Sequence, residues 1–208
     1  INLNKWRKST TAEAILKGGY DQAVGKTTDR MLKDIQKTIR TSFFNFLATG
    51  TGEAAGVDLQ SALANGWGQL QVLFEDDAIQ AVYFVNPLDI ADYLSDAAIT
   101  TQTAFGMTYV ENFLGLGTVI MNASVPKGKI YATAKENIVM YYIPVNGADL
   151  NEAFEFTTDA TGYIGIHEEP DYSNMTASDT VVNGMTFFAE RIDGVVVGTI
   201  GASAGGGT

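Results

Sequence analysis

Several residue types are absent or scarce in this chain of 208 residues. It contains no cysteine, one histidine (His167) and four prolines, and no apolar run reaches the roughly 18 residues that a membrane-spanning helix needs. The lack of cysteine excludes a disulfide scaffold and a thiolate metal site, and it fits a reducing cytoplasm. A single histidine leaves too few parts for a histidine-rich metal centre or most nucleophile–base pairs. These absences favour a protein that is not an enzyme and has no metal, cofactor or membrane contact.

The charge is unevenly distributed along the chain. Residues 1–40 hold nine Lys or Arg against four Asp or Glu, a balance of +5, which leaves −16 for residues 41–208 because the whole chain carries −11. A basic arm followed by an acidic body is typical of copies that associate head to neighbour. The alternative is a nucleic-acid arm, but an acidic body repels phosphate and the arm lacks regularly interleaved aromatic residues.

One long helix is the most informative element that the sequence predicts. Between Thr27 and Gly50, apolar residues recur in steps of three and four, which indicates one stripe along a helix: Met31, Leu32, Ile35, Ile39, Phe43, Phe46 and Leu47. Thr27 or Thr28 is expected to cap its start, and Gly50 and Gly52 to end it. About 22 residues at roughly 1.5 Å each span about 33 Å, which is long for a compact domain of this size.

The rest of the chain predicts an α+β fold. A capping box at residues 10–13 opens a short helix, Asp58 caps a second helix, residues 79–85 form a buried strand, and Pro87 starts another helix. Strands are then expected within residues 117–126, 128–134, 137–145, 153–158, 161–169 and 184–200. Asp193-Gly194 predicts a hairpin with a type I′ turn, whose two central residues need positive φ. Residues 201–208, GASAGGGT, form a glycine-rich tail or linker.

Two groups of residues resemble chemical sites only superficially. Gly25-Lys26-Thr27 before a helix looks like the end of a phosphate-binding loop, but Tyr20 stands where that loop requires glycine. His167 to Asp171 places one histidine beside three acids, yet neighbours along a strand point to opposite faces, so they are not expected to converge on a metal. Trp6 lies in a charged stretch, where it either anchors another surface or packs locally.

The order of these segments resembles the major capsid protein of tailed bacteriophages, the Hong Kong 97 capsid fold. The likeness covers nearly the whole chain and is carried by GGYDQAVGKTTDRMLKDIQKTIRTSFFNFLATG (18–50), AVYFVNPLDIADYL (81–94), FLGLGTVIMNASVPKGKIYATA (113–134) and FFAERIDGVVVGTI (187–200). It implies that residues 1–26 are a remnant of the extended loop or arm. It further implies a discontinuous peripheral domain of residues 27–56 and 147–208, braced by the long spine helix, and an axial domain of residues 57–146.

The resemblance implies a structural head subunit of a phage or prophage. Copies would form pentamers and hexamers of an icosahedral shell around double-stranded DNA, which they touch only through weak non-specific contacts. Portal and scaffold or protease would be partners during assembly in the bacterial cytoplasm, and the final location would be the virion capsid. The residues expected at contacts between subunits are basic or aromatic: Trp6, Arg7, Lys8, Arg30, Lys33, Lys37 and Arg40.

Two alternatives remain open at this point. An encapsulin-like compartment has the same fold but holds enzymes instead of a genome, and a soluble β-rich binding module or enzyme belongs to a different class. The sequence also departs from the family, since little of an N-terminal arm precedes the extended-loop region. The lysine, asparagine and glutamate that crosslink some members cannot be matched by motif, so no crosslinking residues are assigned.

Overall fold

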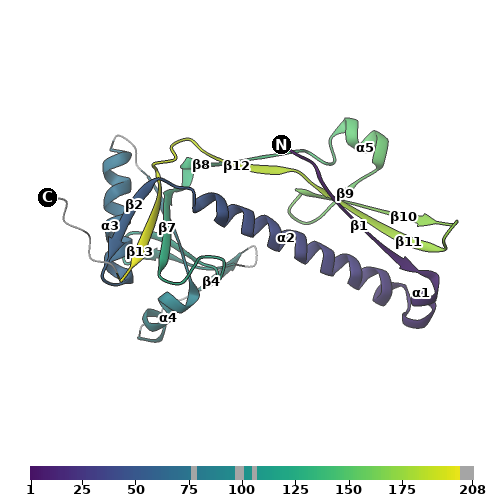
Figure 1. Cartoon of the computed structure of the whole chain (residues 1–208), viewed down its shortest axis with the longest axis horizontal. Coiled ribbons are helices and arrows are strands. Elements are labelled where there is room, and N and C mark those ends of the chain that lie inside the picture. Colours follow the sequence, from purple (N-terminus) through teal and green to yellow (C-terminus); the bar gives the residue numbers. More distant parts are fainter. Residues whose placement is uncertain (76–78, 97–100, 105–106, 202–208) are drawn as a thin grey trace. The chain divides into compact units, whose positions relative to one another are not determined.

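The computed structural model describes residues 1–75, 79–96, 101–104 and 107–201. They divide into two compact units with an α+β architecture (Figure 1). Unit 1 comprises Ile1–Ile39 and Met140–Thr186, and unit 2 comprises Arg40–Val139 and the described residues from Phe187 onwards. The long helix α2 (Lys26–Leu47) contributes its first part to unit 1 and its last turns to unit 2. The predicted long helix is therefore confirmed, whereas residues 202–208 of the predicted tail at 201–208 lie outside the described residues.

Unit 1 is built on a four-stranded antiparallel sheet. Its strand order is β1-β11-β10-β9, with β1 at Asn4–Thr11, β9 at Thr157–Thr158, β10 at Ile164–Asp171 and β11 at Thr176–Asn183. The apolar stripe of α2 packs on one face of this sheet through Met31 and Ile35, which meet Ile164 and Val181. The short helices are α1 (Ala12–Gly18) and α5 (Ala148–Phe154).

The start of α2 differs from the prediction. Neither Thr27 nor Thr28 caps the helix, because a π-helical turn, η1 (Asp21–Gly25), runs directly into it. The Thr27 and Thr28 hydroxyls instead donate to the carbonyl oxygens of Ala23 (2.7 Å) and Val24 (3.2 Å). Threonine caps a helix only where the backbone leaves the helical region, and here the upstream backbone is already helical. Gly25-Lys26-Thr27, which superficially resembles the end of a phosphate-binding loop, is therefore part of a continuous helical stretch.

Unit 2 is built on a seven-stranded mixed sheet of order β2-β13-β7-β3-β6-β5-β4. The strands are β2 (Gly52–Gly56), β3 (Ala81–Val85), β4 (Gln102–Ala104), β5 (Met107–Phe113), β6 (Gly117–Met121), β7 (Lys129–Ala134) and β13 (Val195–Ile200). Its helices are α3 (Leu59–Leu73) and α4 (Pro87–Asp96). Asp58 caps α3 by accepting the Ser61 N–H at 2.7 Å, so that predicted cap is confirmed.

Each face of the seven-stranded sheet carries its own apolar cluster. Leu59, Leu63 and Leu70 of α3 pack on one face against Tyr83 and Ile130. The last turns of α2 pack on the other face, where the aromatic rings of Phe43 and Phe44 meet Phe84 edge to face at 5.4 and 5.6 Å between centroids. A strand covered on both faces has a continuous apolar run, which is why residues 79–85 could be predicted.

Two predicted strand features are wrong. Residues 153–158 form only the short β9, because Ala148–Phe154 is the helix α5, ended by a left-handed Glu155 (φ 50°). The hairpin at Asp193-Gly194 does not form either. Strand β13 is inserted between β2 and β7, while β12 (Met185–Ala189) pairs with β8 (Ile138–Tyr142), which follows the 3₁₀ turn η2 (Lys135–Asn137).

The boundaries of the compact units differ from the predicted division into roles. Residues 40–56 and 187–201 lie in the same unit as residues 57–139, whereas the sequence assigned them to a peripheral domain. The cause is β13, whose strand pairing connects β2 with β7 in one sheet. Which part of the chain is peripheral, axial or an extended loop in an assembly stays a prediction.

Candidate assembly interface

Three of the predicted contact residues lie on β1, an edge strand of unit 1. Side chains alternate along a strand, so Trp6 and Lys8 share one face of the sheet and Arg7 lies on the other. Trp6 is half-buried and packs on the apolar cluster that contains Met31 and Val181. Of the two interpretations open for Trp6, local packing therefore accounts for much of its surface.

Arg7 has a partner within its own unit. Its Nη2 atom donates to Glu169 Oε1 on β10 at 2.7 Å. The side chains remain 55% and 44% exposed, so this ion pair adds on the order of 0–1 kcal/mol to stability. Arg7 thus reaches the surface together with a carboxylate that neutralises it.

Lys8 stands in a cross-strand row that holds two acids. Asp179 on β11 pairs in register with both Lys8 and Glu168 on its two sides. Asp179 is only 1% exposed, and its Oδ2 accepts a short hydrogen bond from the Thr28 hydroxyl at 2.5 Å, while Oδ1 has no partner among the described residues. Burial first, and then the nearby Glu168 carboxylate, raises the pKa of Asp179 despite the opposing hydrogen bond.

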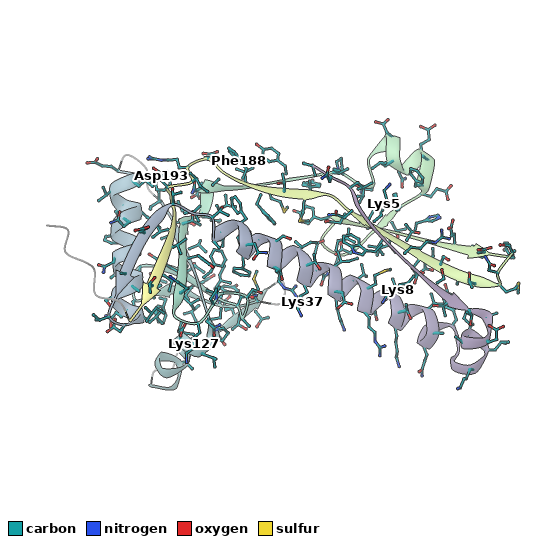
Figure 2. All side chains as sticks on the ribbon, viewed as in Figure 1. Lys5, Lys8, Lys37, Lys127, Phe188 and Asp193 are labelled. Atoms are coloured by element: carbon teal, nitrogen blue, oxygen red, sulfur yellow. The ribbon has the colours of Figure 1, made fainter. Side chains whose placement is uncertain are left out.

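The other four predicted contact residues lie on α2. Arg30, Lys33 and Lys37 are exposed and Arg40 is half-buried, and their spacing of three and four residues places them along one side of the helix. Figure 2 shows Lys37 on α2 and Lys8 on β1. At the start of α2, Lys26 Nζ donates to Gln22 Oε1 at 3.3 Å.

The described residues hold no group of three or more His, Cys, Asp or Glu side chains able to bind a metal. Asp171 instead organises the turn between β10 and β11, accepting from the Ser173 and Asn174 side chains, and these bonds lower its pKa to about 2. His167 lies 4.0 Å from Glu169 between Nε2 and Oε2. Across the same described residues, no helix is both long and apolar enough to cross a membrane.

The sequence interpretation missed two features that the fold makes plain. One is the buried Asp179, which nothing local distinguishes from an exposed acid on a strand. The other is the exposed surface of α3, where Trp67 and Val72 are exposed on different sides of the helix. A signal for this surface was present, because the 15 residues of α3 include no charged residue.

The fold is similar to that of several solved shell structures. The virus-like particle from Pyrococcus furiosus matches 95% of this chain and 75% of its own, with TM-score 0.58 and 14% identity. The similarity to the holo-SrpI encapsulin complex from Synechococcus elongatus covers 95% of this chain and 73% of the encapsulin chain, with TM-score 0.57 and 12% identity. The similarity to the capsid of cyanophage A-1(L) covers 96% of this chain and 77% of the capsid chain, with TM-score 0.60 and 12% identity. No family model and no curated relative matches the chain.

This chain therefore has the Hong Kong 97-type capsid fold, and the predicted α+β fold class is confirmed. The likeness extends over almost the whole chain, which agrees with the resemblance drawn from the order of its segments. At 14% identity and below, the similarity establishes the fold, and the role of the chain follows as a proposal.

Proposed function

We propose that this chain is a shell-forming structural subunit, and specifically the major capsid protein of a tailed phage or prophage. One observation carries the proposal: the chain matches viral capsids and other protein shells over about 95% of its length. Copies would associate into pentamers and hexamers of an icosahedral shell around double-stranded DNA. Assembly would take place in the bacterial cytoplasm, with portal and scaffold or protease as partners, and the product would be the virion capsid.

The mechanism is geometric and electrostatic. The exposed cations Lys8, Arg30, Lys33 and Lys37 belong to a segment of net charge +5, and acids dominate the rest of the chain. Each copy therefore offers an attractive surface to the next, which steers encounter and fixes register more than it adds affinity. Contact with DNA would be weak and non-specific, because the acidic body repels phosphate.

A second candidate function is an encapsulin-like compartment that encloses enzymes. It is supported by similarity to the Synechococcus encapsulin at a TM-score of 0.57, close to the 0.60 of the cyanophage capsid. The neighbouring genes separate the two candidates. Terminase, portal and protease genes would support the capsid, whereas a gene for a cargo enzyme would support the compartment.

Sedimentation velocity of the full-length product tests the shell-forming role itself. A shell of many copies sediments far faster than a protein of 22.3 kDa, so the proposal predicts a fast boundary that contains most of the material. A single slow boundary at the monomer position, at all concentrations and ionic strengths tried, would refute it. That result would favour a soluble β-rich module instead.

A further inference from the structure

The short helix α1 of unit 1 lacks the packing that normally stabilises a helix. Its seven residues, Ala12–Gly18, include no buried side chain, and a helix this short is marginal in water unless an apolar face packs against something. Thr11 caps its start by accepting from Ala14 N–H at 3.4 Å. Leu16 is 86% exposed. The helix therefore presents a large apolar side chain that no described residue of its own chain covers.

Two more exposed apolar side chains lie at the same end of unit 1. Tyr172 is 80% exposed and Met175 is 62% exposed, and both belong to the turn between β10 and β11. A backbone hydrogen bond holds this turn beside α1, because Ala12 N–H donates to the Met175 carbonyl oxygen at 2.9 Å (Figure 1). A group of large apolar side chains this exposed is typical of an interaction surface. We call this surface, with Leu16, Tyr172 and Met175, the apolar end of unit 1.

Unit 2 has an apolar groove of about 500 Å³ on the face of its sheet against which the last turns of α2 pack. Its apolar lining consists of Phe43, Val82, Phe84, Met107, Ile120 and Ile138. Three of these side chains, Val82, Met107 and Ile120, are only half-buried. The side chains that contribute most to protein–protein binding insert into pockets of this kind. The groove can therefore receive an apolar side chain from outside the chain.

Charged side chains stand on two sides of this groove. Lys135, just after β7, and Glu111 on β5 both line it, and both are exposed. Strands β3 and β6 lie between β7 and β5, so three strand spacings, roughly 14 Å, separate the two charged residues across the sheet. Neither forms a salt bridge with another described residue. The groove thus offers a partner one positive and one negative side.

The charges of α1 match this pattern. Glu13 and Lys17 are four residues apart, about 6 Å along the helix. Leu16 lies between them in the sequence, and the spacing of three and four residues from Glu13 places all three side chains on one face. When Leu16 enters the groove, Glu13 is within reach of Lys135. Lys17 is then within reach of Glu111, because four long side chains span the difference in spacing.

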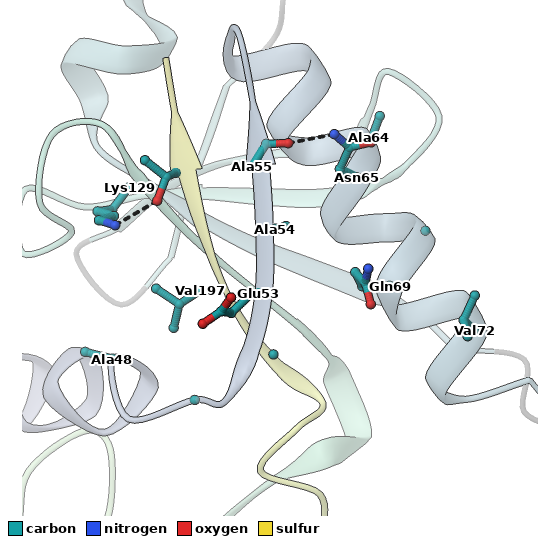
Figure 3. A pocket seen from close by; sticks show the side chains of 14 residues that line it. Ala48, Glu53, Ala54, Ala55, Ala64, Asn65, Gln69, Val72, Lys129 and Val197 are labelled. Carbon is teal, nitrogen blue, oxygen red and sulfur yellow. Dashed lines mark hydrogen bonds between the residues drawn. The ribbon is translucent and has the colours of Figure 1, made fainter. Parts of the chain in front are cut away.

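A second hollow of unit 2 suits the apolar end less well. It has a volume of about 960 Å³ and lies between α3, the edge strand β2 and the end of α2 (Figure 3). Figure 3 shows Asn65 on α3, whose Nδ2 donates to the Ala55 carbonyl oxygen at 2.6 Å. The described residues that line this hollow are mostly small or polar, and the largest apolar ones are Val72 and Val197. It offers no aromatic ring to an inserted side chain.

Other partners match the groove only in part. Nucleic acid or an anionic membrane would be repelled by the Glu111 carboxylate. A small apolar ligand would fill the groove but leave Lys135 and Glu111 unmatched. A second copy of this chain carries an exposed apolar side chain and charges of both signs on one helix, so it matches all three features.

We propose that the groove of unit 2 receives α1 of a second copy, with Leu16 inserted between Lys135 and Glu111. The contact joins two different surfaces, so it is heterologous, and such contacts between identical copies close into a ring when the rotation fits. The inference rests on the proposed function, because a shell requires repeated contacts between copies. It goes further by naming the two surfaces that meet.

Exchanging charges across the contact tests it. Lys17→Glu and Glu111→Lys each bring like charges together, so we expect each to lower the yield of oligomer at least fivefold by mass photometry. The double variant Lys17→Glu/Glu111→Lys restores opposite charges and should recover at least half of the native yield. A damaged fold would not be rescued in this way. Single variants that assemble like the native chain, or two losses that multiply in the double variant, would overturn the proposal.

The apolar side chain gives an independent readout. Leu16→Asp changes a position that its own chain leaves exposed, so the monomer should stay folded by circular dichroism while the yield of oligomer falls at least tenfold. Leu88→Asp, at a 68% exposed position on α4, is the matched control and should assemble like the native chain. Equal yields from the two variants would overturn the proposal.

The absence of native cysteine allows the contact to be trapped. Ala14 on α1 and Gln80 beside Lys135 are both exposed, and replacing them keeps all four charges. The double variant Ala14→Cys/Gln80→Cys, treated with a short bis-maleimide, is expected to give a ladder of dimers, trimers and larger species on a denaturing gel. Each single variant should stay monomeric, because a heterologous contact does not bring two copies of one residue together.

The outcomes separate this inference from the proposed function. Shells without a ladder would overturn the contact and leave the shell-forming role standing. A monomer of altered mobility would also overturn it, since the crosslink would then lie within one chain. A ladder without shells would support the contact and refute the shell. Neither ladder nor shell would refute both.

Discussion

Buried polar side chains differ sharply in how well they are satisfied. Asn137 is 2% exposed and makes three hydrogen bonds: its Nδ2 donates to Thr133 Oγ1 (3.1 Å) and Arg191 O (2.9 Å), and its Oδ1 accepts from Arg191 N–H (2.8 Å). Tyr83 and Asp179 each keep one buried oxygen without a partner among the described residues. An unmade hydrogen bond costs more than a made one contributes, so these two positions weaken the fold.

Removing the Tyr83 hydroxyl should stabilise the chain. The ring is fully buried in the cluster on the α3 face, and burial raises the pKa of its phenol, so the group stays neutral and merely lacks an acceptor. We expect Tyr83→Phe to raise the free energy of unfolding by about 1 kcal/mol, or Tm by roughly 2–4 °C. Tyr109→Phe, which removes a hydroxyl that donates to Gln102 Oε1 at 2.8 Å, is the control and should not stabilise. A lower Tm for Tyr83→Phe would contradict this account.

Asp179 should make stability fall as pH rises. Its folded pKa is raised above the unfolded value, so the folded state binds more protons between the two pKa values. Its contribution is therefore most favourable below the unfolded pKa of about 3.9 and is lost as pH rises through the folded pKa. The groups around it are Lys8 and Glu168 in register on the flanking strands, Thr28 on α2, and Tyr20, whose hydroxyl donates to Glu168 at 3.0 Å.

Asp179→Asn tests this sign. The amide keeps an oxygen acceptor for the Thr28 hydroxyl but carries no charge, so the variant should melt higher than the native chain at pH 7.5. The difference should shrink toward pH 3.5, measured by thermal denaturation across the series. Asp34→Asn, on the exposed side of α2, is the control and should show no such convergence. Parallel profiles of Tm against pH for the native chain and the Asp179→Asn variant would show that the carboxyl is not perturbed.

At the scale of elements, the sequence predicted those helix starts that depend only on residues close by in the chain. Asp58 caps α3, and Pro87 starts α4, because both depend on residues within one turn. Thr27 was misassigned because the preceding residues form a π-helical turn, which no cap pattern indicates. Asp193-Gly194 was misassigned because β13 finds its partners β2 and β7 far away in the sequence.

Gly194 is required for close packing rather than for positive φ. Its φ is not positive, but an added Cβ would lie 2.6 Å from Phe74 Cζ and 3.0 Å from Asn137 Nδ2. We expect Gly194→Ala to destabilise the chain by roughly 1–3 kcal/mol, because ring and amide are both fixed by neighbours. Chemical denaturation measures the loss.

The matched control is Gly68→Ala in α3. An added Cβ there meets nothing within 4 Å, and alanine is the better helix former by about 1 kcal/mol. The two glycines should therefore respond with opposite signs. Equal destabilisation by both substitutions would mean that the crowding around Gly194 is not the cause.

At the scale of the whole molecule, the sequence predicted the fold class and left the contacts to be tested. The order of the long helix, the buried strand and the β-rich half was enough to predict the fold class. This order is retained between proteins whose sequence identity is 14% or less. Surfaces are a different matter. Arg7 looked like a free contact residue, but its partner Glu169 lies 162 positions away and becomes a neighbour only through β10 and β11.

The basic face of α2 gives the cleaner test of electrostatic assembly. Reversing Arg7 and Lys8 to Glu should impair assembly, but it also places acids beside Glu169 and Asp179. Arg30→Glu/Lys33→Glu changes two exposed positions on α2 and should lower particle yield roughly fivefold or more, since about 1 kcal/mol is lost at every repeated contact. The monomer should stay folded by circular dichroism.

Lys127→Glu is the control for that charge change. Lys127 is an exposed cation in the turn before β7 of unit 2 and lies outside the basic segment. It should leave particle yield within experimental scatter. If the α2 variant assembles as well as Lys127→Glu, the basic face is not a contact surface, although another surface still joins the copies.

Cryo-electron microscopy of the full-length product tests the central claim most directly. We predict closed shells whose repeating unit accommodates the two compact units and the helix α2 of this chain. Small monodisperse particles of monomer size, with no closed shells under any assembly condition tried, would contradict the claim that this chain is a shell-forming subunit.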